Sequence, residues 1–548
     1  MNNQLPVDLF HWSTALVPIV VLLVLLVGMR WKAPQAGPIG MFLAALIGIV
    51  LFQAPLDTVA VAGGKGVWDA VFILFVVWPA LILYRVADGA GAFRALRDGI
   101  QRFSRNELFL VLAFGWVFAS FLQGIAGFGV PIAVVAPLLL GLGVKPIYAV
   151  AIPLIGHAWA NMFGTLAVGW LATLQVVDLE DQLLTAVETG ILLWIPNLLA
   201  GFAIAWLYGR MPAVRHAWPL VLIISAVHGG LQLGLMFWDP ILSTFLAATA
   251  ALALLYPLTK WQRYADPAEG IDETPAMKDD REHVAEEDDK KEKPIMGLPM
   301  ALLPYGVLTV AAVIALAIPP IEEALGQLEV GLAFPAVETA LGVEIEAEEP
   351  YSPFAPFTHP GIFLLLAAAV GWAVYHWRGF YAKRAERTGD ETNLWASVVE
   401  DALPASVAVI AFLVMSTLMD HSGQTDVLAL GIAAIAPVPI FAFLANFIGV
   451  LGAFMTSSNT ASNILFAPLQ EQTVEALDGL REPSIIAAQS TGGAIGNAIA
   501  PANVVLGTGT AGIVGREGEV LRKTLPWAGA TAVLVGAATV ALNMLGGE

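Results

Sequence analysis

The sequence predicts an all-α polytopic membrane protein, with about 14 transmembrane helices in two inverted-topology repeats and two re-entrant or broken helical segments. Composition is the first observation behind this prediction, because 58% of the 548 residues are hydrophobic and only 13% are charged. That balance is typical of polytopic membrane proteins. The second observation is a series of apolar runs long enough to cross a bilayer as helices. The third is a set of short sequence matches between the two halves of the chain.

The apolar runs divide the chain into two halves. Residues 1–257 are expected to hold helices 1–8 and a broken segment at 123–143. Residues 298–548 are expected to hold helices 9–14 and a broken segment at 451–470. Both broken segments are too short and too rich in Gly, Pro or Ser to be simple spans. The expected spans lie near residues 13–30, 36–54, 68–86, 107–122, 147–167, 187–208, 216–237, 241–257, 298–319, 360–376, 397–419, 427–449, 484–513 and 525–545.

Two polar regions interrupt the apolar runs. Residues 258–297 are dominated by Asp, Glu and Lys, which predicts an acidic, charged cytoplasmic linker. Residues 320–359 contain eight Glu but no Lys or Arg, and we expect them to form an external loop. Lys and Arg concentrate in the other long loops. Placing those basic loops in the cytoplasm puts both the N-terminus and the C-terminus outside.

Matched residues recur between the two halves. A Gly-x4-Asn spacing at 156–161 is found again at 492–497, and both broken segments run into the tripeptide Ala-Pro-Leu. With the charge-based orientation, the span at 68–86 runs inward while its counterpart at 397–419 runs outward. The two halves are therefore expected to be antiparallel in the membrane. Inverted-topology repeats with broken helices are typical of secondary transporters.

Small polar residues gather at the two breaks, where lipid exposure of an unpaired polar group would cost several kcal/mol. The glycines of the first break let backbone N–H groups approach an anion. The helix after each break would point its positive, N-terminal end at that anion. A tight helix–helix interface is the alternative explanation for such residues. Ser490 and Asn503 are further polar residues expected to line the same cavity. The candidate substrate-binding residues are Gln123, Gly127, Phe128, Gly129, Asn161, Ser457, Ser458, Asn459, Thr460, Asn463, Gln489, Thr491 and Asn497.

Three titratable residues are candidates for carrying a coupling proton. His157 lies in an apolar run, where an imidazole could titrate near the middle of the membrane. A neutral, hydrogen-bonded core histidine is the alternative explanation for it. Asp401 and Asp69 occupy matched positions near helix ends in the two halves, where carboxylates also serve as solvated or capping groups.

Composition and motifs exclude several other classes of protein. A net charge of −19 does not suit nucleic-acid binding, and the absence of cysteine excludes disulfides. The sequence contains no phosphate-binding loop, zinc-protease motif or serine-hydrolase motif. We therefore expect a protein that is not an enzyme, without a cofactor or a metal site.

Four stretches carry a resemblance to a known family. They are GIAGFGVPIAVVAPLLLGLG (124–143), LIGHAWANMFGTLAVG (154–169), LGAFMTSSNTASNILFAPLQ (451–470) and AAQSTGGAIGNAIAPANVVLG (487–507). Together they resemble the L-lactate permease family, which moves lactate, glycolate and related 2-hydroxy monocarboxylates with protons. The family's pattern commonly has an asparagine at the position of His157 and an acid at the position of Asn459. The Ser-Asn-Thr at 458–460 also resembles the tip signature of sodium-coupled dicarboxylate carriers.

The resemblance implies a secondary active transporter that imports a small 2-hydroxy monocarboxylate, L-lactate or glycolate, by proton symport. The expected partners are the carboxylate substrate, a co-transported proton or sodium ion, and the lipid bilayer of the cell membrane. A sodium-coupled carboxylate transporter and a channel-like anion pore remain the alternatives. The sequence does not determine the oligomeric state.

Overall fold

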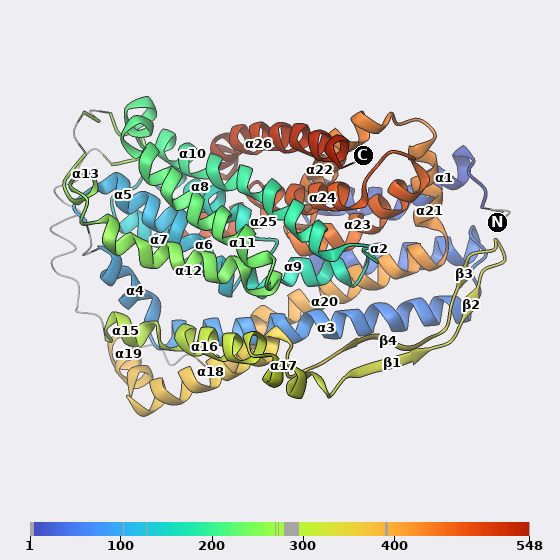
Figure 1. The fold of residues 1–548 in the computed structure, drawn as a ribbon, viewed down its shortest axis with the longest axis horizontal. Coiled ribbons are helices and arrows are strands. Elements are labelled where there is room, and N and C mark those ends of the chain that lie inside the picture. The colour runs from blue at the N-terminus through green and yellow to red at the C-terminus, as the bar shows by residue number, and fades with distance from the viewer. Residues whose placement is uncertain are drawn as a thin grey trace.

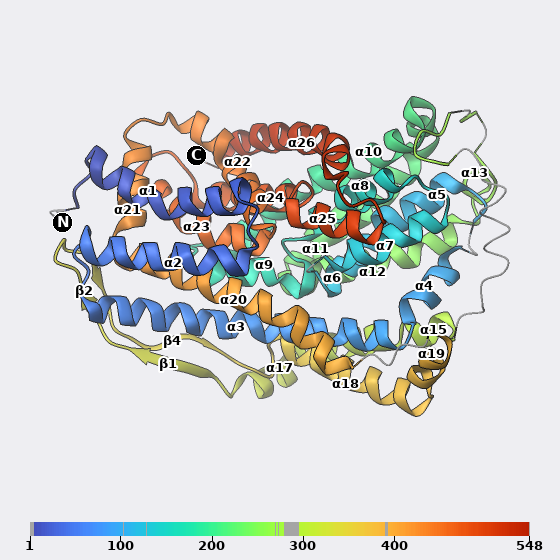
Figure 2. The same ribbon diagram turned by 180° about the vertical axis from the view of Figure 1, so that it is seen from behind.

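The computed structural model describes residues 5–101, 104–127, 129–268, 270–271, 273–278, 295–388 and 393–546, and most of these residues are helical. Long helices run side by side along the longest axis of the molecule (Figure 1). The N-terminus lies at one end, beside the strands, and α13 lies at the opposite end (Figures 1 and 2). Much of the expected linker, residues 279–294, falls outside the described residues.

The first half of the chain and the start of the linker contain helices and no named strand among their described residues. They are α1 (Leu9–Leu23), η1 (Val24–Gly28), α2 (Ala33–Val50), α3 (Leu56–Gly89), α4 (Ala92–Gln101), α5 (Glu107–Leu112), η2 (Ala113–Phe118), α6 (Ala119–Ile125), α7 (Val130–Gly141), α8 (Pro146–His157), η3 (Ala158–Ala160), α9 (Gly164–Leu174), α10 (Gln182–Ser225), η4 (Ala226–Leu231), α11 (Gln232–Met236), α12 (Pro240–Leu258) and α13 (Gln262–Ala265).

The second half contains helices and four short strands. They are α15 (Leu298–Ala301), α16 (Leu303–Ala317), α17 (Pro319–Gly326), β1 (Val330–Phe334), β2 (Val337–Glu338), β3 (Glu344–Ile345), β4 (Glu348–Phe354), α18 (Pro360–Trp377), α19 (Phe380–Thr388), α20 (Leu394–His421), α21 (Gln424–Ala433), α22 (Val438–Thr456), α23 (Asn459–Ala476), α24 (Glu482–Asn497), α25 (Pro501–Thr510) and α26 (Glu517–Leu545).

The number of spans is lower than expected. Within the described residues, ten helices are long and apolar enough to cross a membrane, or up to twelve if each of two bent pairs counts as one span. The expected spans 187–208 and 216–237 lie in one run, Gln182–Met236, which leaves helical geometry at Gly209 and Arg210. The expected span 484–513 is two helices, because Ala500 is extended and Pro501 starts α25. The structure therefore does not confirm the count of about 14.

The expected external loop contains the exception to the all-α prediction. In two small antiparallel sheets, β1 pairs with β4 and β2 pairs with β3. The β1–β4 hairpin packs against α3, where Lys65 Nζ lies 2.7 Å from Glu348 Oε1 and Tyr351 donates a hydrogen bond of 2.9 Å to Asp69 Oδ2. Aromatic and β-branched residues favour strands here, and the prolines of the loop prevent a helix. The protein is therefore mostly helical rather than all-α.

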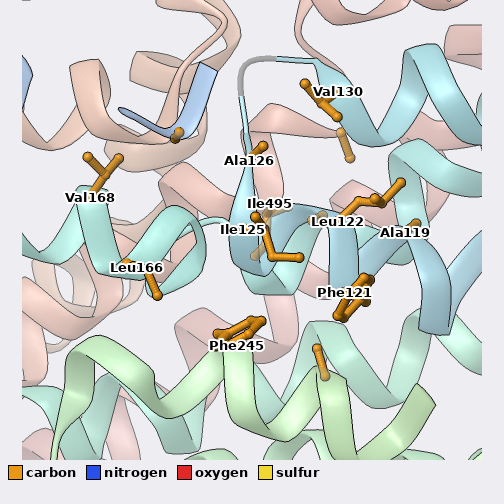
Figure 3. Packing of buried hydrophobic residues seen from close by; sticks show 14 of the residues in the cluster. Ala119, Phe121, Leu122, Ile125, Ala126, Val130, Leu166, Val168, Phe245 and Ile495 are labelled. Atoms are coloured by element: carbon orange, nitrogen blue, oxygen red, sulfur yellow. The ribbon is translucent and has the colours of Figure 1, made fainter. Parts of the chain in front are cut away.

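The two breaks expected from the sequence are present in the helical core. One lies between α6 and α7, and the other between α22 and α23. Buried hydrophobic residues hold the first break in place, with Phe121 and Ile125 of α6 next to Phe245 of α12 (Figure 3). The rings of Phe121 and Phe245 are 6.4 Å apart.

Two glycines at matched positions allow unusually close helix packing. A Cβ atom on Gly156 of α8 would lie 1.9 Å from the carbonyl oxygen of Gly115. A Cβ atom on Gly492 of α24 would lie 1.9 Å from the carbonyl oxygen of Asn446. Each glycine therefore lets its helix touch the backbone of the neighbour that leads into a break. This packing explains why the Gly-x4-Asn spacing occurs in both halves.

Candidate functional site

A single cavity lies between the two breaks. Its empty volume is about 500 Å³ including its mouth. Residues from both halves of the chain line it: Gln123, Gly127, Gly129, Ile132, His157, Asn161, Thr165, Val168, Ser457, Ser458, Asn459, Thr460, Asn497 and Asn503. The structure thus brings together nine of the thirteen candidate substrate-binding residues and the candidate His157.

The first break is shaped by glycine and by a threonine from α9. Gly129 has φ of 83°, a left-handed conformation that glycine adopts without steric cost, and α7 starts directly after it. A Cβ atom at Gly129 would lie 2.3 Å from Cδ2 of Leu506. The amide of Gly127 donates a hydrogen bond of 2.8 Å to Oγ1 of Thr165. Gly127 and Gly129 both line the cavity.

The second break is shaped by two serines. Ser457 ends α22 in a left-handed conformation with φ of 58°, and Ser458 is the N-cap of α23. Ser458 Oγ accepts a hydrogen bond of 3.2 Å from the amide of Ala461, and Ser457 Oγ accepts one of 3.2 Å from the amide of Ala502. The starts of α7, α23 and α25 therefore lie beside the cavity. Helix N-termini carry partial positive charge and favour anions.

Three asparagines form a chain of amide hydrogen bonds along the cavity. Asn161 Nδ2 donates to the carbonyl oxygen of Ala158 at 2.8 Å, and its Oδ1 accepts from Asn497 Nδ2 at 3.1 Å. Asn503 Nδ2 in turn donates to Oδ1 of Asn497. This chain joins α24 and α25 to the turn that follows α8. It holds the two halves in register at the site.

Asn459 is a cavity residue whose hydrogen bonding is incomplete. It is 2% exposed, and its Oδ1 has no hydrogen-bond partner in the part of the chain that the structure describes. Its Nδ2 faces only the sulfur of Met162, at 3.7 Å. A buried polar atom without a partner costs about 1–3 kcal/mol. The Oδ1 of Asn459 packs against Gly493 of α24, where an added Cβ atom would lie 2.0 Å away, so Asn459 also fixes the start of α23 against α24.

The cavity offers neutral donors rather than fixed charges. Its described lining contains no Lys, Arg, Asp or Glu, and His157 is its titratable side chain. His157 Nδ1 lies within hydrogen-bonding distance of the carbonyl oxygen of Pro153. A neutral imidazole that donates through Nδ1 keeps Nε2 available as a proton acceptor. The site can thus combine dipolar anion binding with one titrating group.

Three other candidate substrate-binding residues lie behind the cavity wall. Asn463 Nδ2 donates to Thr173 Oγ1 at 3.0 Å, and Gln489 Nε2 donates to the carbonyl oxygen of Ser462 at 3.2 Å. Thr491 is fully buried, and its hydroxyl has no partner within the described residues. These residues support the second break from α23 and α24. The remaining candidate, Phe128, lies outside the described residues.

The two aspartate candidates for proton coupling are not part of the cavity lining. Asp69 accepts a hydrogen bond from Tyr351, on the face of α3 that carries the β1–β4 hairpin. Asp401 forms an ion pair with Arg85, whose Nη2 lies 2.6 Å from Oδ2 of the aspartate. The structure places both carboxylates against charged or polar partners on α3 or its hairpin.

Sequence reasoning missed three lining residues. Ile132 and Val168 supply apolar walls and cannot be told from core residues by their sequence context. Thr165 begins a stretch of three residues in left-handed geometry, with φ values of 52°, 50° and 61° at Thr165, Leu166 and Ala167. Left-handed geometry costs about 1–2 kcal/mol per residue other than glycine, so sequence propensity gives no indication of it.

Apolar helices around a buried polar cavity, with two helix breaks meeting at it, define an integral membrane transporter rather than an enzyme. The chain belongs to the L-lactate permease family, whose profile matches residues 12–546. It is 27% identical over 546 residues to the L-lactate permease of Halalkalibacterium halodurans, covering 97% of this chain and 96% of that protein. It is 27% identical over 530 residues to the glycolate permease GlcA of Escherichia coli, covering 93% and 92%.

Some solved structures also align with this chain. The YdaH transporter of Alcanivorax borkumensis aligns with a TM-score of 0.44 and 16% sequence identity, covering 88% of this chain and 87% of that chain.

Proposed function

We propose that this protein is a secondary active transporter that imports L-lactate, glycolate or a similar 2-hydroxy monocarboxylate together with a proton. The observation that carries the proposal is the cavity at which both breaks meet, lined by hydroxyls, amides and helix N-termini. The names of the two relatives, a lactate permease and a glycolate permease, support the substrate class.

A small carboxylate matches the donors around this cavity. Its two oxygens would accept hydrogen bonds from the backbone at the starts of α7 and α23, where helix dipoles favour negative charge. The 2-hydroxyl group would bond to the polar side chains of Ser458, Asn459 or Thr460, which line the cavity. An anion held by dipoles is released more readily than one held by a buried arginine, and a transporter must both bind and release its substrate.

His157 is the proposed carrier of the coupling proton. It lines the same cavity as the substrate, so an imidazolium formed there would neutralise the bound carboxylate. An unpaired charge at the middle of the membrane costs at least ~2.5 kcal/mol, and moving the neutral pair is cheaper. Asp69 and Asp401 are less suited, because their carboxylates are engaged by Tyr351 and Arg85 outside the cavity lining.

The arrangement of elements supports two inverted repeats, 1–257 and 298–548, joined by a cytoplasmic linker at 258–297. In both halves a broken pair of helices is followed by a second broken pair: α6–α7 and α8–α9 in the first half, α22–α23 and α24–α25 in the second. The N-terminus and the strands of the 320–359 loop share one end of the molecule (Figure 1). That is consistent with an N-terminus outside, and the C-terminus is placed outside by the same charge rule.

Sodium coupling is the second candidate function. The hydroxyls of Ser457, Ser458 and Thr460 line the cavity and are oxygen ligands of the kind that a sodium ion needs. A channel-like pore is less favoured, because its polar lining would have to continue across the protein, whereas the polar residues here gather at the two breaks.

Uptake of radiolabelled L-lactate into proteoliposomes tests the proposal. Accumulation driven by an inward proton gradient, saturable and competed by glycolate, is the expected result. Accumulation that follows a sodium gradient at constant pH would assign the second candidate. Ionic currents that do not saturate with lactate would indicate a pore, and the absence of any lactate movement would overturn the proposed substrate class.

A further inference from the structure

Two apolar side chains interrupt the polar lining of the transport cavity. Among the described lining residues, Ile132 of α7 and Val168 of α9 carry hydrocarbon side chains, whereas the others are polar residues or glycine. Both are buried, with exposed fractions of 0% and 5%. Neither side chain can donate or accept a hydrogen bond, so neither contributes to holding a carboxylate.

The two apolar residues flank the first break. Gly129 directly precedes α7, and Ile132 is the third residue of that helix. Val168 lies three residues after Thr165, whose Oγ1 accepts a hydrogen bond of 2.8 Å from the amide of Gly127. The hydrocarbon side chains therefore stand beside the start of α7, where the carboxylate is proposed to bind.

Packing holds both side chains in place. Ile132 belongs to a buried cluster with Val150, and a Cβ atom on Gly507 of α25 would lie 3.0 Å from its Cγ2. Val168 belongs to the main hydrophobic core, and in Figure 3 it points to the side of α9 opposite Leu166. Isoleucine and valine are branched at Cβ, which restricts rotation about χ1. The two residues therefore form walls of fixed shape.

The structure of a 2-hydroxy acid gives such walls a role. Its carboxylate and its hydroxyl group need hydrogen-bonding partners, which the hydroxyls and amides of the cavity supply. The remaining substituent on C2 is hydrogen in glycolate, methyl in L-lactate and ethyl in 2-hydroxybutyrate. An alkyl group placed against the cavity asparagines would bury their polar atoms without a partner, which costs free energy. It is better accommodated against Ile132 and Val168.

We propose that Ile132 and Val168 bind the C2 substituent of the substrate and set the preference among 2-hydroxy acids. This inference rests on the proposed function, because it concerns the same cavity and the same substrate class. Burial of one methyl group corresponds to a roughly fourfold gain in affinity. The two walls therefore favour L-lactate over glycolate, and their fixed shape limits the length of the substituent.

Binding of glycolate, L-lactate and 2-hydroxybutyrate to the purified full-length protein tests this inference. Val168→Ala and Ile132→Val, each measured alone, remove carbon atoms from one wall. We expect each variant to bind L-lactate roughly fourfold more weakly while glycolate affinity stays within about twofold. The affinity for 2-hydroxybutyrate should rise relative to that for L-lactate, because the pocket is larger.

The ratio of L-lactate affinity to glycolate affinity is the decisive measurement. A variant that merely lowers the folded fraction changes the binding of both acids alike and leaves this ratio unchanged. Val135→Ala is the matched control, because it makes the same substitution at a buried residue of α7 outside the described cavity lining. It should leave the ratio unchanged.

The failure of this inference can be told from the failure of the proposed function. If both acids bind and neither wall variant changes the ratio, this inference is wrong and the proposed function stands. An equal change of the ratio in Val135→Ala would also overturn the inference. If the unaltered protein binds neither acid, the proposed function fails and this inference fails with it. Thermal unfolding checks folding, and Ile132→Val, which removes a single methylene, carries the test if Val168→Ala does not fold.

Discussion

Asn497 donates a hydrogen bond of 3.1 Å to Oδ1 of Asn161, although 336 residues separate them in the chain. Each asparagine ends a Gly-x4-Asn spacing, and the glycine of each spacing packs against the backbone of a neighbouring helix. The pair therefore joins the two halves of the protein at the cavity. Its position makes it the first target for mutation.

Asn161 and Asn497 share a hydrogen bond. The effects of Asn161→Ala and Asn497→Ala on lactate affinity should therefore not be additive. We expect a coupling free energy of about 0.5–3 kcal/mol from the double-mutant cycle, measured by lactate binding to the purified protein. Asn161→Ala combined with Thr539→Val is the control, because among the described residues the Thr539 hydroxyl bonds only the carbonyl oxygen of Val535, within α26. Additive effects in the asparagine pair would contradict the role of this hydrogen bond.

Asn459→Leu should weaken lactate binding by about 1–3 kcal/mol, since it removes the side chain that we place against the substrate. Thr473→Val is the control on the same helix: Thr473 is buried, and its hydroxyl bonds only the carbonyl oxygen of Leu469 in the part of the chain that the structure describes. That variant should change stability without changing lactate affinity. Unchanged affinity in Asn459→Leu would remove Asn459 from the site.

Gly129→Ala should impair transport more than Gly143→Ala. Both glycines have left-handed φ angles, 83° and 85°, so both substitutions cost roughly 1 kcal/mol of backbone strain. Only the Cβ atom at Gly129 clashes, at 2.3 Å from Leu506, whereas that at Gly143 would lie 3.8 Å from Met277. Lactate uptake and thermal unfolding are measured on both variants. Gly143→Ala reports the effect of backbone strain alone, and any further loss in Gly129→Ala reports the clash with Leu506. Equal uptake would mean that the first break tolerates a shift.

His157→Asn should reduce lactate uptake driven by a pH gradient while leaving exchange of internal for external lactate intact, because only net uptake needs the proton. His228→Asn is the control: His228 is a buried histidine that packs on Trp116 and Trp159 and does not line the cavity. It should leave the pH dependence of uptake unchanged. Intact gradient-driven uptake in His157→Asn would make His157 a structural residue.

Cysteine labelling in this cysteine-free chain tests the orientation. Gln327→Cys, in the loop proposed to be external, should react in whole cells with a thiol reagent that does not cross membranes. Glu273→Cys, in the linker proposed to be cytoplasmic, should react only after the membrane is permeabilised. Both positions are exposed, so a difference in labelling between the two cysteines reports the side of the membrane rather than burial. The opposite pattern would invert the proposed topology.

Much of the site could be predicted because helix breaks are encoded locally. Glycine at 124, 127 and 129 and serine at 457 and 458 interrupt apolar runs, and small polar residues in lipid require a partner. Nine residues chosen on this ground line one cavity. The sequence could not separate Asn463 and Gln489, which support the wall, from Asn459, which lines it, because all three are amides in apolar helices.

The sequence by itself determined that the chain is a helical membrane protein with two breaks, although it did not predict the four strands. The length of each apolar run and the residues that interrupt it are local features of the sequence. Only the tertiary structure decided which groups meet. It paired Asp401 with Arg85, attached a strand hairpin to α3, and brought Thr165 to the amide of Gly127. Such contacts join residues far apart in the chain, and packing of whole helices, rather than local preference, fixes their geometry.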